Sequence, residues 1–117
     1  MTAVLVASTD TERHVVILTV EGASLDEGHV DTMGSALAVL PSGFGLVIDL
    51  TGVNELGPAL IADLRDLARD ASLTGRTLVF VCGDLAGRAE LVLADLDSLA
   101  PVVEALEQAV PLVRTAA

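Results

Sequence analysis

The chain has 117 residues, a size typical of one domain, and 52% of them are hydrophobic, which is enough to fill a single core. Seventeen acidic and six basic side chains give a net charge of -11, so most of the surface repels a nucleic-acid backbone or an anionic membrane. This charge excludes nucleic acid as an expected partner and favours neutral or basic protein surfaces.

Membrane insertion and secretion are not expected. The longest apolar runs are about five residues, whereas a membrane span needs about 20, and the N-terminus lacks the basic and apolar regions of a signal peptide. The single cysteine, Cys82, cannot form an internal disulfide or a multi-cysteine metal cluster, which fits a reducing compartment. We therefore expect one cytoplasmic domain over residues 1–117.

The first third of the chain predicts two strands and a helix. Residues 3–7 are apolar, a polar turn follows, and residues 14–20 (HVVILTV) are rich in β-branched side chains, so the two runs predict a hairpin. The segment between Gly22 and Pro41 predicts a helix with acidic residues near its start, where the helix dipole favours them. Its apolar residues at helical spacing are Val30, Met33, Leu37 and Leu40.

The middle of the chain predicts a strand, a helix and another strand. Residues 46–50 (LVIDL) are apolar except for Asp49, which is the pattern of a central strand covered on both faces. A helix over residues 59–71 precedes a second buried strand over residues 77–82. The apolar stripe of this helix consists of Leu60, Ile61, Leu64, Leu67, Ala68 and Ala71, and the outward residues are Asp63, Arg65, Asp66, Arg69 and Asp70.

The last third predicts a short helix over residues 88–96, a brief edge strand over residues 101–103, and a final helix from Glu104 that Pro111 limits or kinks. Alternating strands and helices require parallel strands joined by right-handed crossovers. The predicted fold is therefore a single α/β domain with a mostly parallel sheet of about four to five strands, an N-terminal antiparallel hairpin and about four helices.

Five segments in a fixed order carry a family resemblance. They are VVILTVEGASLD, VIDLTGV, ALIADLRDLARDA, the GRTL start of the next strand, and LDSLAPVVEALEQAV. Over about residues 10–110, the chain resembles the STAS family, the domain of anti-sigma factor antagonists and of sulfate-transporter tails. The resemblance implies a STAS-like fold and a role in protein–protein interaction.

The phosphorylation motif of signalling STAS members is absent. In those members, the counterpart of DLTGV is followed by Asp-Ser-Ser-Gly or Asp-Ser-Thr-Gly, whose serine is phosphorylated by an anti-sigma factor kinase. An ungapped alignment from Asp49 places Pro58 and Ala59 at the two hydroxyl positions, between Gly57 and Leu60. Pro58 cannot accept phosphate, although proline suits the first helical position because its missing N–H would have no partner there.

The ELGP segment, residues 55–58, has two open interpretations: a partner-binding loop, or an ordinary helix start in a diverged domain. The residues assigned to partner binding are Asn54, Glu55, Leu56, Gly57, Pro58, Ala59, Leu60 and Asp63. Thr51 is the nearest alternative hydroxyl for phosphorylation, but a turn-stabilising role is favoured for it. We expect Asp49 to be structural, with its carboxylate hydrogen-bonded at the strand end, because an unpaired buried carboxylate is costly.

Other polar residues receive structural interpretations. His14 is expected to open a strand, and neither it nor His29 has a nearby ligand for zinc. Cys82 is expected to be a buried thiol without a redox role. Glu21, Asp26, Glu27 and Asp31 are assigned to a solvated helix start in preference to a docking face. No nucleotide-binding glycine motif occurs, so no enzyme activity, cofactor or metal is expected.

Three functional classes remain. The first is a cytoplasmic interaction module that resembles an anti-sigma factor antagonist and binds a kinase-like anti-sigma factor or related regulator without the serine switch. The alternative is an accessory subunit that docks on the ATPase of a lipid ABC transporter. A nucleotide or small-ligand sensor is the weaker alternative, because aromatic and basic residues are scarce.

Overall fold

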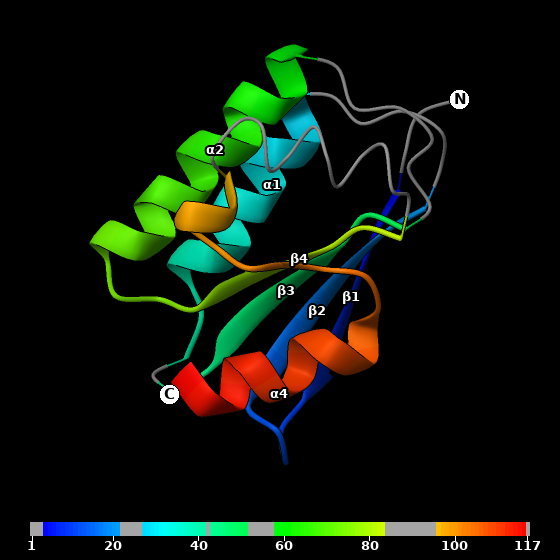
Figure 1. Ribbon diagram of the computed structural model, residues 1–117, viewed down its shortest axis with the longest axis vertical. Coiled ribbons are helices and arrows are strands. Elements are labelled where there is room, and N and C mark those ends of the chain that lie inside the picture. The colour runs from blue at the N-terminus through cyan, green and yellow to red at the C-terminus, as the bar shows by residue number, and fades with distance from the viewer. Residues whose placement is uncertain (1–3, 22–26, 42, 52–57, 84–95, 117) are drawn as a thin grey trace.

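A five-stranded sheet separates two layers of helices in the computed structural model (Figure 1). The structure describes residues 4–21, 27–41, 43–51, 58–83 and 96–116. The strands are β1 (Val4–Asp10), β2 (Val15–Glu21), β3 (Gly45–Asp49), β4 (Leu78–Val81) and β5 (Val102–Val103), in that order across the sheet. The β1–β2 pair is antiparallel and the later pairs are parallel, so the predicted hairpin and mostly parallel sheet are confirmed.

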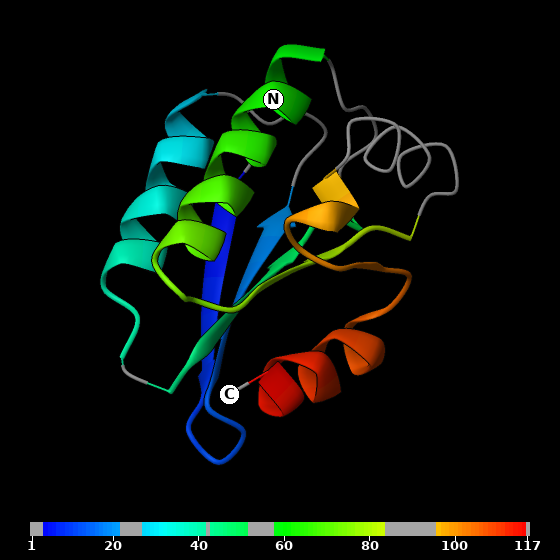
Figure 2. The same ribbon diagram turned by 60° about the vertical axis from the view of Figure 1, so that its left-hand side comes forward.

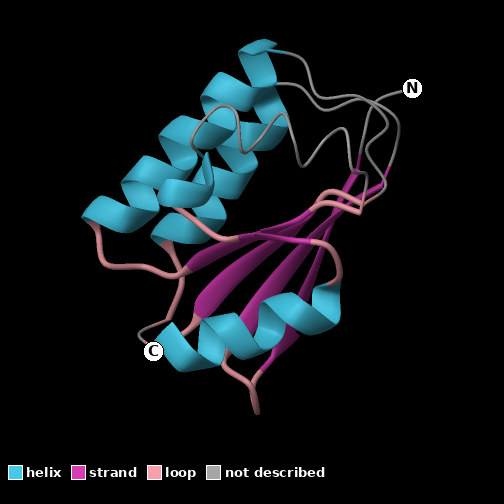
Figure 3. Cartoon of the chain, viewed as in Figure 1, coloured by secondary structure: helices cyan, strands magenta, loops and turns pink. Residues whose placement is uncertain are grey.

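The helices cover both faces of the sheet. Helices α1 (Glu27–Ala38) and α2 (Pro58–Leu73) lie side by side on one face, and α4 (Leu106–Ala116) lies on the other (Figures 2 and 3). A short 3₁₀ helix, η1 (Leu96–Ser98), contacts α2. The described residues thus contain three α-helices, and the further helix predicted over residues 88–96 lies almost wholly outside them. None of the described helices combines the length and apolar composition that a bilayer-spanning helix requires.

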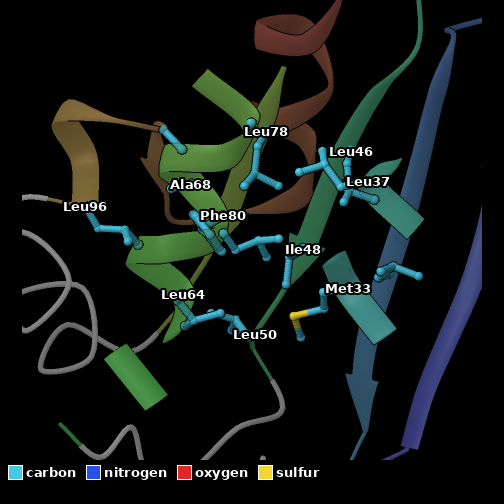
Figure 4. Packing of buried hydrophobic residues seen from close by; sticks show 14 of the residues in the cluster. Met33, Leu37, Leu46, Ile48, Leu50, Leu64, Ala68, Leu78, Phe80 and Leu96 are labelled. Atoms are coloured by element: carbon cyan, nitrogen blue, oxygen red, sulfur yellow. The ribbon is translucent and has the colours of Figure 1, made fainter. Parts of the chain in front are cut away.

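The alternation of side chains along the strands builds a core on each face of the sheet. On β3, Leu46 and Ile48 point toward α1 and α2, whereas Val47 points toward α4, and all three are fully buried. Figure 4 shows Met33 of α1 and Leu64 of α2 packed around the first of these clusters, with Phe80 of β4. The prediction that β3 is a central strand covered on both faces is confirmed.

The hairpin turn corrects the prediction for His14. Strand β1 continues to Asp10, whose carboxylate accepts hydrogen bonds from the N–H groups of Glu12 and Arg13 at 3.1 Å. His14 then adopts a φ of 57° and belongs to the turn, so it does not open β2. Histidine is among the residues that tolerate this left-handed conformation best, and its ring packs edge-on against Phe44 with centroids 5.1 Å apart.

Helix α4 shows that Pro111 does not end the last helix, whereas a kink at this proline stays a prediction. The helix begins at Leu106 and continues through Pro111 to Ala116. Its start is capped by Gln108, whose side-chain oxygen accepts hydrogen bonds from the N–H groups of Glu104 and Ala105 at 3.0 and 3.1 Å. Its buried face adds Ala109 and Val110 to the core beneath the sheet, and this packing offsets the cost of an internal proline, about 3 kcal/mol.

The ends of α1 and α2 meet at the turn that leads into β4. Gly75 adopts a φ of 70°, and the Arg76 N–H donates to the carbonyl of Ala71 at 2.9 Å, which together end α2 in a Schellman motif. The Arg76 guanidinium then donates to the carbonyls of Leu40 at 2.9 Å and Ala38 at 3.5 Å. One arginine therefore donates to the last carbonyl of α1 and to a carbonyl two residues beyond the helix.

Candidate protein-interaction site

The carboxyl ends of β3, β4 and β5 converge at one edge of the sheet. A Cβ atom on Gly83, just after β4, would lie 3.6 Å from Thr51 Cγ2 and 3.8 Å from the Glu104 carbonyl oxygen. Thr51 follows β3 and Glu104 follows β5, so three strand ends meet around Gly83. Open α/β sheets place their binding sites outside this edge.

Asp49 and Thr51 form a closed turn at the end of β3. Asp49 Oδ1 accepts hydrogen bonds from the Thr51 N–H at 3.0 Å and from the Thr51 hydroxyl at 2.7 Å. The half-buried carboxylate is therefore hydrogen-bonded at the strand end, which confirms the structural expectation for Asp49. Thr51 is exposed, and its use as a phosphorylation site stays a prediction.

The predicted partner-binding segment leads into α2. Asn54, Glu55, Leu56 and Gly57 lie outside the described residues. Helix α2 begins at Pro58, so the expected place of this proline at the first helical position is confirmed. Ala59 and Leu60 follow in the first turn, and Asp63 lies on the next turn, half-buried. The partner-binding role of this set stays a prediction.

A groove of about 760 Å³ runs between α1 and α2 on the outer surface. Small side chains on α1 keep it open, because Gly34, Ser35 and Ala38 leave space that longer residues would fill. A Cβ on Gly34 would lie 4.0 Å from Leu67 Cδ1, so the two helices approach each other closely at this point. Among the described residues, the lining consists of Asp31, Gly34, Ser35, Ala38, Asp63, Asp66, Leu67 and Asp70.

The groove is strongly acidic. Four of the eight described lining residues are aspartates, and Asp31, Asp66 and Asp70 are exposed. The Arg69 guanidinium lies 3.8 Å from the Asp66 carboxylate and offsets part of this negative charge. In the described part of the chain, no three His, Cys, Asp or Glu residues are grouped so that they could hold a metal ion. The groove is instead suited to the lysine or arginine side chains of a protein partner.

Sequence reasoning identified only one wall of this groove. It placed Asp63, Asp66 and Asp70 on the outer face of α2, but it assigned Asp31 to a solvated helix start. The overlooked signal is the spacing of Asp31, Gly34, Ser35 and Ala38, which recur at intervals of three and four residues and thus share one helix face. Only a neighbouring helix turns such a face into a groove.

The other candidates have structural places or fall outside the described side chains. Cys82 is 3% exposed and belongs to the larger core cluster, so the prediction of a buried thiol is confirmed. His29 and Glu27 lie in α1, and Glu21 ends β2. The structure describes the backbone of these three residues but not their side chains. Asp26 lies outside the described residues.

Comparison with known proteins gives structural likeness without sequence likeness. No protein-family model matches the chain, and no curated protein matches its sequence. An anti-sigma factor antagonist from Mycobacterium paratuberculosis superposes with a TM-score of 0.71 at 23% identity, over 96% of this chain and 94% of that one. The protein TM1081 gives 0.72 at 17% identity, over 92% and 86%.

A third solved structure agrees. An anti-sigma-factor antagonist (STAS) domain protein from Planctomyces limnophilus gives a TM-score of 0.70 at 15% identity, over 97% of this chain and 98% of that one. The three superpositions cover 92–97% of this chain and 86–98% of the other chains. The protein therefore has the fold of a STAS domain.

Proposed function

We propose that this protein is an interaction module of the anti-sigma factor antagonist type. It binds a kinase-like anti-sigma factor or a related regulatory protein through residues 54–60 and the acidic groove between α1 and α2. The observation that carries this proposal is the groove itself, which runs along the helix that residues 54–57 lead into, on a fold shared with two anti-sigma factor antagonists.

Electrostatics favour a basic surface on the partner. The four groove aspartates contribute to a net charge of -11, and a field of one sign accelerates encounter with a partner of the opposite sign. The same proposal places the protein in the cytoplasm, where its buried thiol, Cys82, stays reduced. The chain acts by binding and catalyses no reaction.

Binding in this proposal is independent of serine phosphorylation. Phosphate on a serine at the start of α2 would add about two negative charges to the interface, and this is how phosphorylation weakens capture. Pro58 and Ala59 offer no hydroxyl there, so the chain keeps the state that binds. Control, where it exists, acts on another component.

The direct test is affinity capture of the tagged chain from its own host, followed by calorimetry with the purified partner. We expect a kinase-like regulatory protein to bind the unmodified chain, and mass spectrometry to find no added phosphate after incubation with ATP. Phosphate transfer to the chain would contradict the loss of the switch. Capture of transporter ATPase subunits in place of a regulator would move the protein to the alternative class.

A charge in the predicted loop should weaken this complex. We expect Leu56→Asp or Leu60→Asp to weaken binding by more than about 1 kcal/mol, because the substitution buries an unpaired carboxylate in the interface. The measurement is the dissociation constant by calorimetry, with circular dichroism to verify the fold. Unchanged affinity in a folded variant would place the interface elsewhere.

A further inference from the structure

The outer edge of β1 is an unpaired strand edge in the described part of the chain. Strand β1 pairs with β2 on one side only, and alternate residues direct their N–H and C=O groups away from β2. Val6, Ala7, Ser8 and Thr9 are all exposed. Because consecutive side chains point to opposite faces, this segment is open to solvent on both faces as well as along its edge.

This edge lacks the features that usually protect a sheet edge. Natural proteins discourage pairing with prolines, lysines, bulges or very short strands. The sequence of β1, VLVASTD, has no proline or lysine, and its register with β2 continues unbroken from Val4 opposite Glu21 to Asp10 opposite Val15. The opposite edge is different, because β5 has two residues and follows Pro101.

The charge pattern of β1 favours a second copy of this chain as its partner. Two chains of net charge -11 repel each other over most of their surfaces, yet the only charged residue of β1 is Asp10 at its end. In an antiparallel pair centred on Ala7, each Asp10 lies opposite Val4 of the other strand, so the two carboxylates are at opposite ends. Like charges directly opposite each other are thereby avoided.

The same register uses the whole strand. Centring on Ala7 pairs all seven residues of β1, whereas centring on Val6 or Ser8 pairs only residues 4–8 or 6–10. A two-fold axis perpendicular to the sheet, midway between the two copies of Ala7, makes the contact the same for both chains. The strand is thus self-complementary in length, register and charge.

We propose that this protein forms a two-fold homodimer in which β1 pairs antiparallel with β1 of a second copy, joining the two five-stranded sheets into one continuous sheet. This inference is independent of the proposed function. None of the described residues that line the acidic groove belongs to β1 or β2, so each dimer presents the groove twice.

Cysteine cross-linking tests the register. In the proposed dimer, the Cβ atoms of the two residues at position 7 lie about 4.5–5.5 Å apart, close to disulfide range, so Ala7→Cys should give a covalent dimer under mild oxidation. Thr9→Cys is the matched control, because its two copies are offset by four residues, about 14 Å along the strand. The unmodified chain controls for Cys82, which is buried.

A non-reducing gel reads the result. We expect a dimer band for Ala7→Cys and monomer bands for Thr9→Cys and the unmodified chain. Failure of Ala7→Cys to cross-link, or equally fast cross-linking of Thr9→Cys, would overturn the proposed pairing.

Sedimentation equilibrium tests the dimer without a cross-link. Ala7→Lys places two like charges directly opposite each other, whereas Thr11→Lys adds the same charge in the exposed hairpin turn, beyond the end of β1. At about 0.15 M salt, where the screening length is about 8 Å, we expect dimers of the unmodified chain and of Thr11→Lys, with at least a tenfold weaker association for Ala7→Lys. Monomers of the unmodified chain at every concentration, or unchanged dimerisation of Ala7→Lys, would overturn the proposal.

Discussion

Arg76 shows how one side chain joins two distant segments. Its guanidinium donates to the carbonyls of Leu40 and Ala38 at 2.9 and 3.5 Å, and its planar fork suits two acceptors better than a lysine ammonium would. We expect Arg76→Ala to lower the free energy of unfolding by about 2 kcal/mol, because hydrogen bonds to a charged donor are lost at the end of α1. Urea denaturation followed by circular dichroism measures this change.

Arg69→Ala is the control for that measurement. Arg69 is exposed on α2, and its 3.8 Å ion pair with Asp66 should contribute less than about 1 kcal/mol to the free energy of unfolding. If the two alanine variants were equally stable, the Arg76 contacts would have no special role in holding the end of α1.

At the scale of elements, α1 and α2 approach each other closely at Gly34, in the interior of α1. An added Cβ would lie 4.0 Å from Leu67 Cδ1, which is an ordinary van der Waals contact. Glycine costs about 1 kcal/mol more than alanine inside a helix, so we expect Gly34→Ala to raise the free energy of unfolding by about 0.5–1 kcal/mol. Thermal unfolding would report the gain.

Gly75→Ala should have the opposite sign. Gly75 has nothing within 4 Å of an added Cβ, but its φ of 70° strains any residue that carries one, so we expect Gly75→Ala to lower the free energy of unfolding by about 1 kcal/mol.

Destabilisation by Gly34→Ala would contradict the first of these two predictions and would show that the helices cannot accept the extra methyl group. It would also show that this glycine is required for their close approach.

For the whole molecule, the acidic groove should determine how salt affects partner binding. Replacing Asp63 and Asp66 by asparagine removes two of the four carboxylates in the described lining, so we expect about tenfold weaker binding of the regulatory partner, about 1.4 kcal/mol, and a smaller loss of affinity at high salt. Calorimetric titration across a range of salt concentrations measures both effects.

The matched control is the double replacement Glu12→Gln and Glu107→Gln. Both residues are exposed, one in the hairpin turn and one on α4 across the sheet from the groove, and the pair changes the net charge equally. If the control weakened binding as much as the groove variant, the net charge of the whole protein, and not the groove, would determine the affinity for the partner.

The sequence alone was sufficient to predict the strands, the order of the described strands and α-helices, and the core faces of α1 and α2. These features depend on local periodicity, and residues such as Leu46, Ile48, Met33 and Leu64 are buried as their spacing predicts. Pro58 at the start of α2 and the Asp49 hydrogen bonds likewise follow from short-range chemistry. The missing phosphorylation motif is a property of the sequence itself.

Tertiary structure decided what depends on distant partners. His14 lies in the hairpin turn, where its ring packs against Phe44 and its carbonyl accepts a hydrogen bond from the Gly45 N–H at 3.0 Å. Helix α4 continues through Pro111 while its buried face packs beneath β3 and β4. The groove required Asp31 and Asp63 to meet across two helices that are separated along the chain. Periodicity predicts which face of each helix is buried, but only packing determines which exposed faces become neighbours.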